Sequence, residues 1–383
     1  MTTSYAGPFC TEVLGALGAD VIKVEPPETG DEARTWGPPS FEGTSTMFLT
    51  ANANKRSVAI RLRRGGGIVR RLAETADVFV QSLRPGLVEE LGLDAPTLRA
   101  GNERLVYCSM TGFGTHGPLT GRLGYDPLAQ AAGGIVSVTG EAGGPGVRAG
   151  ISLVDQTTGI WAALTILGAL MRRGQTGEGA VVDLSLYETA VSFMGYHLAG
   201  FAASGAVPGR HGTAFPSIAP YQTFAASDGE LMIAAGNDRA FAALAEVVAL
   251  PELAAEPRFA TNEKRIAARD EIAGAIAARI ALETREYWLG RLASAGVPAA
   301  AVQDVGEVAD HPQTAALGLL PLLGGLPIAR LPFSVDGVAV THRSAAPRLG
   351  NDTEEVLREA GYSDAEIRDL AAAGVIGLDG GDQ

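Results

Sequence analysis

Positive charge, cysteine and long apolar runs are all scarce in this chain. Lysine and arginine together number 30 against 43 aspartates and glutamates, so the net charge is −13 at pH 7. A nucleic-acid partner requires clustered positive charge, and we expect none here. Polar and charged residues interrupt every apolar stretch before the roughly 18 residues that a membrane span needs. The sequence therefore predicts neither a nucleic-acid partner nor a membrane partner.

Cysteine and histidine are too few to build a disulfide framework or a metal centre. The two cysteines, Cys10 and Cys108, lie in apolar surroundings and are expected as reduced core residues. The five histidines are scattered along the chain, and none has metal-ligand spacing, so no metal site is expected. The first ten residues lack the basic segment followed by an apolar run that marks a secretory signal. These features predict a cytoplasmic protein.

The glycine and proline content is high, which indicates many sharp junctions between short elements. The chain has 50 glycines and 21 prolines. In the first 110 residues, short apolar runs alternate with helical patterns, which predicts an α/β fold with a parallel sheet covered on both faces. Strands are expected at 19–25, 56–62, 76–81 and 105–110, and helices at 9–18, 66–75 and 88–91.

A second, smaller unit is expected after a change of composition near residue 196. A length of 383 residues also favours two domains. Strands are expected at 221–224, 231–234 and 298–302, and helices at 238–249, 263–281, 284–295, 353–360 and 363–373. The sequence predicts a large discontinuous domain (1–195 and 336–383), a small α+β domain (214–310) and two linkers (196–213 and 311–335).

Residues 148–159, RAGISLVDQTTG, place one carboxylate between a strand-like run and a helical run. The apolar run before Asp155 predicts a strand, and residues 160–171 predict a helix. Gly150 and Gly159 leave space on either side of Asp155. Aspartate is a preferred N-cap residue, so the plain interpretation is a helix cap. The other interpretation is a nucleophile at a strand-to-helix turn.

Several segments, in order along nearly the whole chain, resemble the class III coenzyme A transferases. This CaiB/BaiF type includes formyl-CoA and carnitine CoA-transferases. The segments are 6–34, 54–57, 76–86, 123–134, the Asp155 turn, 177–191, 234–238 and 346–357. The resemblance implies that the large domain is a Rossmann-like parallel-sheet domain. It also implies a homodimer of interlocked chains, in which both linkers wrap the partner.

The resemblance implies that Asp155 is the catalytic nucleophile. Its carboxylate would attack an acyl-CoA thioester and give a mixed anhydride and a CoA thiolate. The acceptor acid would then attack, and the thiolate would recapture the acceptor acyl group. The helix that follows Asp155 is expected to favour its ionised form, with Gln156 and nearby amides as oxyanion donors. The partners would be an acyl-CoA and a small carboxylic acid. Coenzyme A is then a substrate, with no permanently bound cofactor and no metal.

The resemblance assigns the CoA contacts to four short segments. They are Tyr5 and Ala6; Ile60, Arg61 and Arg63; Ser82, Leu83 and Arg84; and Leu123, Gly124, Tyr125 and Asp126. The arginines among them, together with Arg64, would pair with the CoA phosphates, because a guanidinium binds phosphate through parallel hydrogen bonds. A loop of Ala235, Gly236 and Asn237 would cover the reacting acyl group. Segment 212–224 is closer to members acting on succinyl-CoA and small dicarboxylates, so succinyl-CoA is a candidate donor.

Tyr125 separates two activities that this type of fold supports. A related α-methylacyl-CoA racemase has a histidine at this position to remove an α-proton, whereas this chain has tyrosine. Asn237 also stands where an opposing base would be needed, and proton abstraction at carbon requires two bases. The sequence therefore favours a transferase, with an acyl-CoA racemase or isomerase as the alternative.

Two departures from the resemblance leave a third possibility open. Pro26 and Glu90 stand where some members have an arginine near the nucleotide. The first five residues, MTTSY, stand where relatives have a strand. This second departure suggests either a different start of the chain or a weakened site, so a non-catalytic CoA-binding protein is the third interpretation.

Overall fold

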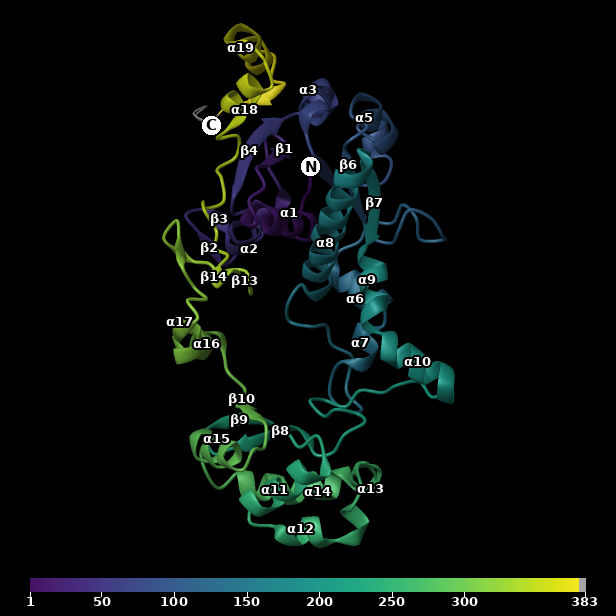
Figure 1. Cartoon of the computed structure of the whole chain (residues 1–383), viewed down its shortest axis with the longest axis vertical. Helices are drawn as coiled ribbons and strands as arrows, with labels where there is room; N and C mark the ends of the chain where they lie inside the picture. The colour runs from purple at the N-terminus through teal and green to yellow at the C-terminus, as the bar shows by residue number, and fades with distance from the viewer. Residues whose placement is uncertain (379–383) are drawn as a thin grey trace. The chain divides into compact units, whose positions relative to one another are not determined.

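The computed structural model describes residues 1–378, which form two compact units (Figure 1). The first unit comprises residues 1–135, 148–205 and the chain from Ala316 onward. The second comprises residues 136–147 and 206–315. These units reflect contacts within a single chain. The predicted domain limits, and the predicted linkers at 196–213 and 311–335, therefore stay a prediction.

The first unit contains two three-stranded sheets rather than one continuous sheet. In one, β1 (Val21–Glu25) runs parallel to β4 (Lys55–Ile60), and β15 (Ile376–Gly377) pairs antiparallel with β4. In the other, β5 (Val78–Gln81), β6 (Val106–Thr111) and β7 (Ala180–Ser185) are all parallel. The four strands predicted in the first 110 residues are therefore present.

The N-terminal residues bond to elements of both sheets. The Met1 amino group donates to the Val80 carbonyl at 2.9 Å, and the Ser82 amide donates to the Met1 carbonyl at 3.2 Å. Lys23 of β1 donates from Nζ to the Thr2 carbonyl at 3.0 Å. The start of the segment MTTSY thus lies along β5 and is fixed to β1, although it forms no strand of its own.

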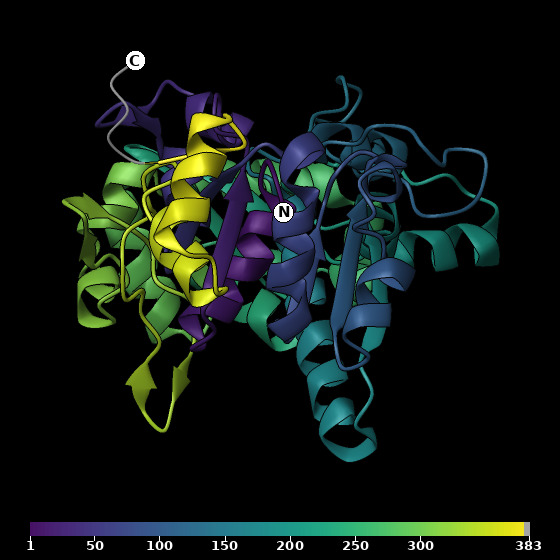
Figure 2. The same ribbon diagram turned by 90° about the horizontal axis from the view of Figure 1, so that it is seen from above.

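Helices pack on these sheets and bury the apolar positions predicted for the core. Val58 and Ile60 of β4 pack with Ile68 of α3 and Val356 of α18. In Figure 2 the C-terminal helices (yellow) lie beside the N-terminal strands (purple), and α18 contacts β4. The helices are α1 (Ala6–Ala16), α2 (Thr46–Ala51), α3 (Leu62–Thr75), α4 (Leu87–Glu90), α5 (Ala95–Gly101), α6 (Asp126–Ala132), α8 (Leu153–Thr176), α9 (Leu186–Phe193), α10 (Gly195–Ser204), α18 (Thr353–Glu359) and α19 (Asp364–Ala372).

The segment at 54–57, NKRS, fastens distant parts of the first unit to β4. Asn54 Oδ1 accepts the amides of Arg343 and Ser344 at 2.5 and 3.1 Å. Lys55 is buried, and its Nζ donates to the carbonyls of residues 8 and 51 at 2.7 and 2.8 Å. The Ser57 amide donates to Asp352 at 2.7 Å. The segment NKRS therefore has a structural role, because it bonds the C-terminal part of the chain, at residues 343–352, to β4.

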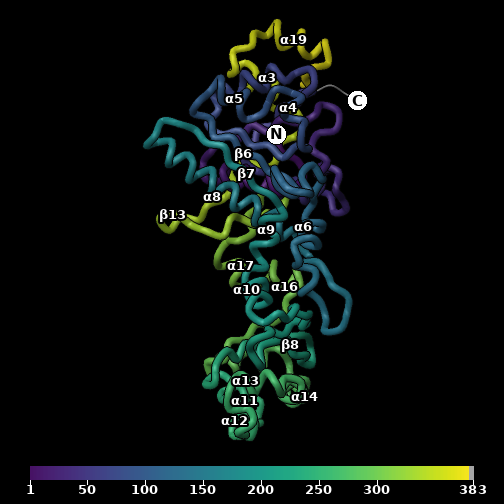
Figure 3. Tube along the Cα trace, turned by 90° about the vertical axis from the view of Figure 1, so that its right-hand side faces the viewer, coloured from purple at the N-terminus to yellow at the C-terminus, as the bar shows by residue number. Residues whose placement is uncertain are grey.

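The second unit is an antiparallel sheet covered by helices. Its strands are β8 (Tyr221–Ala226), β9 (Gly229–Ala234) and β10 (Ala299–Ala301), in the order β10–β9–β8. Within this unit α14 (Arg269–Ile280) contacts β8, and Figure 3 shows it with α11 (Asp238–Val247) and α13 (Asn262–Ala267) in the same unit. The remaining helices are α12 (Pro251–Ala255), α15 (Arg285–Ser294) and α16 (Val305–Asp310). The predicted α+β character of this region is present.

Regular structure differs from the sequence-based expectation in three places. The segment 196–213 was predicted as a linker, but its first half belongs to α10, which contains three alanines, one leucine and one phenylalanine. The helix expected at 263–281 is two helices, α13 and α14, because Ala268 leaves helical geometry at φ −107°. The linker at 311–335 contains α17 (Pro312–Ala316) and the short strands β11 (Leu322–Leu323), β12 (Leu326–Pro327) and β13 (Ser334–Val335).

Among the described residues, α8 is long and apolar enough to cross a membrane by length and composition. A core helix of a soluble protein passes the same test. Within the first unit, α8 packs against α1, α9 and β7. The close approach of α1 depends on Gly159, where an added Cβ would lie 2.8 Å from the carbonyl oxygen of Ala6 and 3.1 Å from the Cys10 amide nitrogen.

We predict that Gly159→Ala destabilises the protein by about 1–3 kcal/mol, because the methyl group pushes α1 away from α8. Gly174→Ala, in the last turn of the same helix, is the matched control, since an added Cβ there meets nothing within 4 Å. That control is expected to be neutral or stabilising, by up to about 1 kcal/mol. Urea unfolding of both variants measures the difference, and equal stability would contradict the proposed contact.

Candidate functional site

Asp155 lies inside the first turn of α8 rather than at its N-cap. The helix begins at Leu153, and Ser152 is the N-cap residue. The strand predicted before Asp155 is therefore absent, and residues 151–154 lead directly into the helix. The apolar run was misread because Leu153 and Val154 are the first residues of α8 rather than the end of a strand.

The first amides of α8 are capped by Asp126, which comes from α6. Asp126 Oδ2 accepts the amide of Val154 at 2.7 Å and that of Asp155 at 3.1 Å. Its other carboxylate oxygen accepts from Gln130 Nε2, and Gln130 Oε1 accepts the Ala149 amide at 2.8 Å. Asp126 is only 3% exposed. These contacts favour a positioning role for Asp126 over the CoA contact that the resemblance implies.

The environment of Asp155 favours its neutral form. Burial, followed by the negative charge of Asp126, raises the pKa of the Asp155 carboxyl to about 7. This reverses the expectation that the helix N-terminus favours the ionised form, because the nearest free amides are occupied by Asp126. At neutral pH the carboxyl is therefore poised between its two protonation states.

Asp155 opens into a cavity of about 190 Å³ within the first unit. The cavity lies at the carboxyl ends of the parallel strands β5, β6 and β7, which is where open α/β sheets bind ligands. The predicted contacts that line it are Ala6, Ser82, Leu83, Arg84, Leu123, Gly124 and Tyr125. The structure thus brings seven of the twelve predicted CoA contacts to the cavity that Asp155 lines.

The other predicted CoA contacts do not line this cavity. Tyr5 is buried beside it, and its hydroxyl accepts from Gln156 Nε2 at 3.3 Å. Ile60 is fully buried in the core. Arg61 is paired with Glu28, and Arg63 lies 3.6 Å from Glu90 on the surface. The role of these residues toward CoA stays a prediction.

Several cavity residues were missed by sequence reasoning. Glu32 accepts a hydrogen bond from Ser4 Oγ at 2.6 Å and one from the Tyr125 hydroxyl at 3.4 Å. Burial and the charge of Glu32 raise the pKa of Tyr125, which keeps its phenol protonated. Thr111 and Gly112 directly follow the strand predicted at 105–110, and this position is the signal that could have found them. The missed residues are Thr3, Ser4, Gly7, Glu32, Pro85, Met110, Thr111, Gly112, Arg122 and Leu186.

The loop predicted to cover the acyl group lies in the second unit. Ala235 is buried, and Gly236 is exposed. Asn237 is the N-cap of α11, since its Oδ1 accepts the Ala240 amide at 2.9 Å. Arg265 is buried beneath the loop and donates to Asp238 at 2.6 Å. The approach of this loop to Asp155 stays a prediction.

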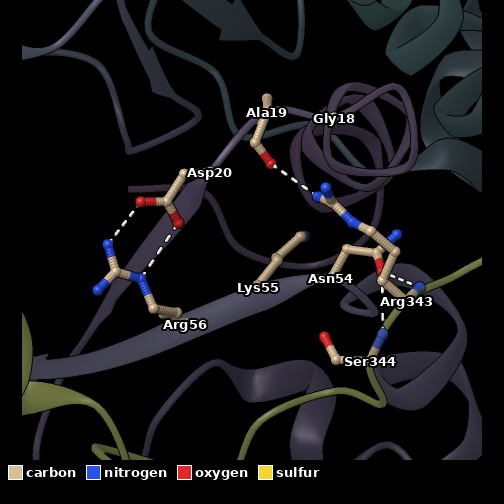
Figure 4. Close-up of a pocket in the computed structure, with 8 residues that line it drawn as sticks. All are labelled: Gly18, Ala19, Asp20, Asn54, Lys55, Arg56, Arg343 and Ser344. Atoms are coloured by element: carbon tan, nitrogen blue, oxygen red, sulfur yellow. Dashed lines mark hydrogen bonds and ion pairs between the residues drawn. The ribbon is translucent and has the colours of Figure 1, made fainter.

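A second hollow, of about 320 Å³, lies where the NKRS segment meets the returning chain (Figure 4). Arg56 is paired with Asp20 at 2.5 Å, and Arg343 donates to the Ala19 carbonyl at 3.2 Å (Figure 4). Lys55 also lines this hollow, but its Nζ is already saturated by backbone acceptors and Asn52. The hollow is therefore less suited to catalysis than the cavity at Asp155.

Comparison with known proteins gives one consistent result. A family model described as CoA-transferase family III matches residues 1–353. A succinyl-CoA:glutarate CoA-transferase of Mus musculus is 36% identical over 98% of this chain and 88% of its own length. A succinate–glutarate CoA-transferase of Agrobacterium fabrum is 34% identical over 92% of each chain. The crystal structure of a CAIB/BAIF family protein from Brucella suis superposes with a TM-score of 0.85 at 38% identity, covering 94% of this chain and 97% of that one.

We predict that Asp155→Asn stabilises the protein more at pH 8 than at pH 5. The folded-state pKa of Asp155 is raised to about 7, so its neutral form favours folding at low pH. This contribution to the free energy of unfolding is lost as the pH rises through about 7, where the carboxyl ionises. The side-chain amide of the Asp155→Asn variant does not ionise, so the variant keeps its stability at high pH. The gain at pH 8 is on the order of a few kcal/mol.

Thermal unfolding at both pH values measures this gain. Asp369→Asn, an exposed carboxylate on α19, is the control for general effects of charge. A gain from Asp155→Asn that is the same at pH 5 and pH 8 would show that the carboxyl titrates normally.

Proposed function

The chain belongs to CoA-transferase family III, and from this premise we propose that it moves CoA between carboxylic acids through an anhydride on Asp155. The transferase class follows from the relatives, which are named CoA-transferases and are covered to 88% and 92% of their own length. The single observation that supports Asp155 as the acyl carrier is its position. Asp155 lines the cavity at the ends of the parallel strands. Its own backbone amide donates to Asp126, so its side chain is not used to cap the helix.

The proposed reaction keeps every acyl group activated without an external energy source. The Asp155 carboxylate attacks the thioester carbon, the C–S bond breaks, and CoA leaves as a thiolate. The acceptor carboxylate attacks the Asp155 acyl carbon of the anhydride and releases the donor acid. The retained thiolate then attacks the acceptor acyl carbon, the C–O bond breaks, and the Asp155 carboxylate is restored.

The surroundings of Asp155 suit this chemistry. A carboxylate that is desolvated and close to another negative charge is less stabilised in its ionised form, so it gains more by forming an ester-like bond. A pKa near 7 also leaves a large ionised fraction at neutral pH. A partly closed cavity of about 190 Å³ slows attack of water on the anhydride.

We propose dicarboxylic acids as the substrates, with succinyl-CoA as a donor. Relatives named for succinyl-CoA, glutarate, D-citramalate and mesaconate support this class. An acetyl-CoA:oxalate CoA-transferase from Acetobacter aceti is also 36% identical, and oxalate is again a dicarboxylate.

A racemase or isomerase is the alternative activity. It is disfavoured because Tyr125 donates to Glu32 and keeps its proton. A non-catalytic CoA-binding protein is disfavoured because the start of the chain is fixed along β5, where it completes the wall that includes Thr3 and Ser4.

We predict that Asp155→Ala and Asp155→Asn lower CoA exchange by at least about a thousandfold, while CoA binding persists. The measurement is transfer of CoA from succinyl-CoA to a panel of carboxylates. Asp369→Asn, remote on α19, is the control and should keep full turnover.

CoA transfer, measured together with α-deuterium exchange and CoA binding, separates the three activities. Exchange of CoA indicates a transferase, and exchange of α-deuterium without CoA transfer indicates a racemase. CoA binding without either reaction indicates a non-catalytic protein. Substantial turnover by Asp155→Ala would contradict the anhydride mechanism.

We also propose that two chains form an interlocked homodimer in the cytoplasm. One observation that supports a second copy is the exposed apolar face of the first unit. Ile160, Trp161, Leu164 and Met171 of α8 are 47–77% exposed, and a face of this kind on one chain indicates an interface. The two buried, free cysteines are consistent with a reducing compartment. In the dimer, the loop around Gly236 would reach Asp155 from the small domain of one of the two chains.

We predict a dimer at every practical dilution, because threaded chains separate only on unfolding. Sedimentation velocity at nanomolar concentration, combined with circular dichroism, measures this. A folded and active monomer would overturn the interlocked arrangement.

A further inference from the structure

The loop between β6 and α6 is pinned at its base against the catalytic cavity. Gly112 and Gly124 touch across the base, since a Cβ added to Gly112 would lie 2.7 Å from the Gly124 Cα atom. Only glycine allows this approach of two backbones. Both glycines line the cavity that holds Asp155. The residues just before Gly124 are therefore held at the cavity wall.

Arg122 lies on the returning arm of this loop and also lines the cavity. Within residues 1–378, its guanidinium has no hydrogen-bond or ion-pair partner, and the side chain is exposed. The other arginine of the cavity, Arg84, is already paired with Glu90 at 3.0 Å. Arg122 is thus the cavity arginine that is available to an incoming anion in the described part of the chain.

The charged groups of the cavity indicate what kind of ligand Arg122 could bind. Asp155 and Glu32 line the wall with Arg84 and Arg122, and Arg84 is already paired with Glu90, so Arg122 is the guanidinium left to balance these two carboxyl groups. An acid with two carboxylates is repelled more strongly than an acid with one, unless a cation receives the second group. A guanidinium is suited to this because it binds a carboxylate through two parallel hydrogen bonds.

We propose that Arg122 is a specificity-determining residue that binds the remote carboxylate of a dicarboxylic acyl group. This inference rests on the proposed function of the cavity. While one end of the acyl chain reacts at Asp155, the other end pairs with Arg122. A monocarboxylic acyl group of the same length gains nothing from this contact.

A phosphate of CoA offers the same anionic chemistry as a carboxylate, so the test must separate the two sources. Succinyl-CoA and butyryl-CoA have acyl chains of four carbons and identical CoA moieties, but only the first carries a second carboxylate. Binding of both is measured by calorimetry in an Asp155→Asn background, which prevents turnover. The variants are Arg122→Gln and Arg122→Lys, with Arg368→Gln on α19 as the exposed, remote control.

The expected result is a preference for succinyl-CoA over butyryl-CoA that falls roughly tenfold or more in Arg122→Gln, which corresponds to ~1.4 kcal/mol. Butyryl-CoA affinity is unchanged, Arg122→Lys retains part of the preference, and Arg368→Gln retains all of it. Equal weakening of both ligands would assign Arg122 to a CoA phosphate and overturn the inference. An unchanged preference in Arg122→Gln, or no preference in the parent protein, would also overturn it.

A failure of the proposed CoA-transferase function would be detected by a different measurement, which is CoA exchange by the wild-type protein. In that case the wild-type protein exchanges no CoA with any acid, whatever the binding preference. Circular dichroism of Arg122→Gln and Arg122→Lys confirms that each variant is folded before binding is measured.

Discussion

The bond between the buried Asp126 carboxylate and the first amides of α8 is the constraint on which the site depends. It fixes where α8 begins, and it removes the hydrogen-bond donors that would otherwise stabilise a negative charge on Asp155. The two carboxylates therefore divide two tasks. Asp126 caps the helix, and Asp155 faces the cavity with a pKa raised to about 7. Gly159, one turn further along α8, lets α1 approach and close the wall beside Tyr5 and Ala6.

This arrangement costs stability and gains reactivity. An ionised carboxylate that is largely desolvated beside a second negative charge is unfavourable in a folded protein. Other buried charges of the first unit are paired with a charge of opposite sign, as Lys23 is with Asp31 and Arg34 with Glu25. Strained or poorly solvated groups of this kind are expected where a protein carries out chemistry.

Much of the fold could be predicted from the sequence because the apolar periodicity is local. The strands β1, β4, β5 and β6 follow directly from short apolar runs bounded by turn residues. The helix predicted at 363–373 is present as α19, and the spacing of Ser363 and Glu366 that forms its capping box is readable in the sequence. Helix α10 was missed because Gly195, Gly200 and Gly205 obscure the helical pattern.

The site could be predicted only in part. Asp155 was found through its resemblance to a family motif, but its place within the helix was not, because the capping residue is 29 positions away in sequence. Glu32 lies within the family-like segment 6–34 and Arg122 directly before the segment 123–134, but only the folded chain brings both side chains to the cavity. The family relationship explains why the transferase class was correct, whereas the acid pair depends on contacts of single side chains.

The most direct test of the account is to trap the acyl-enzyme during turnover. An anhydride on Asp155 is far more electrophilic than a carboxylate, so hydroxylamine added with succinyl-CoA should convert Asp155 to its hydroxamate. Peptide mass spectrometry then locates the modified residue. The account predicts a label on Asp155 that requires acyl-CoA and is absent without it. An active enzyme that carries the label only at another residue, or carries none, would contradict the central claim.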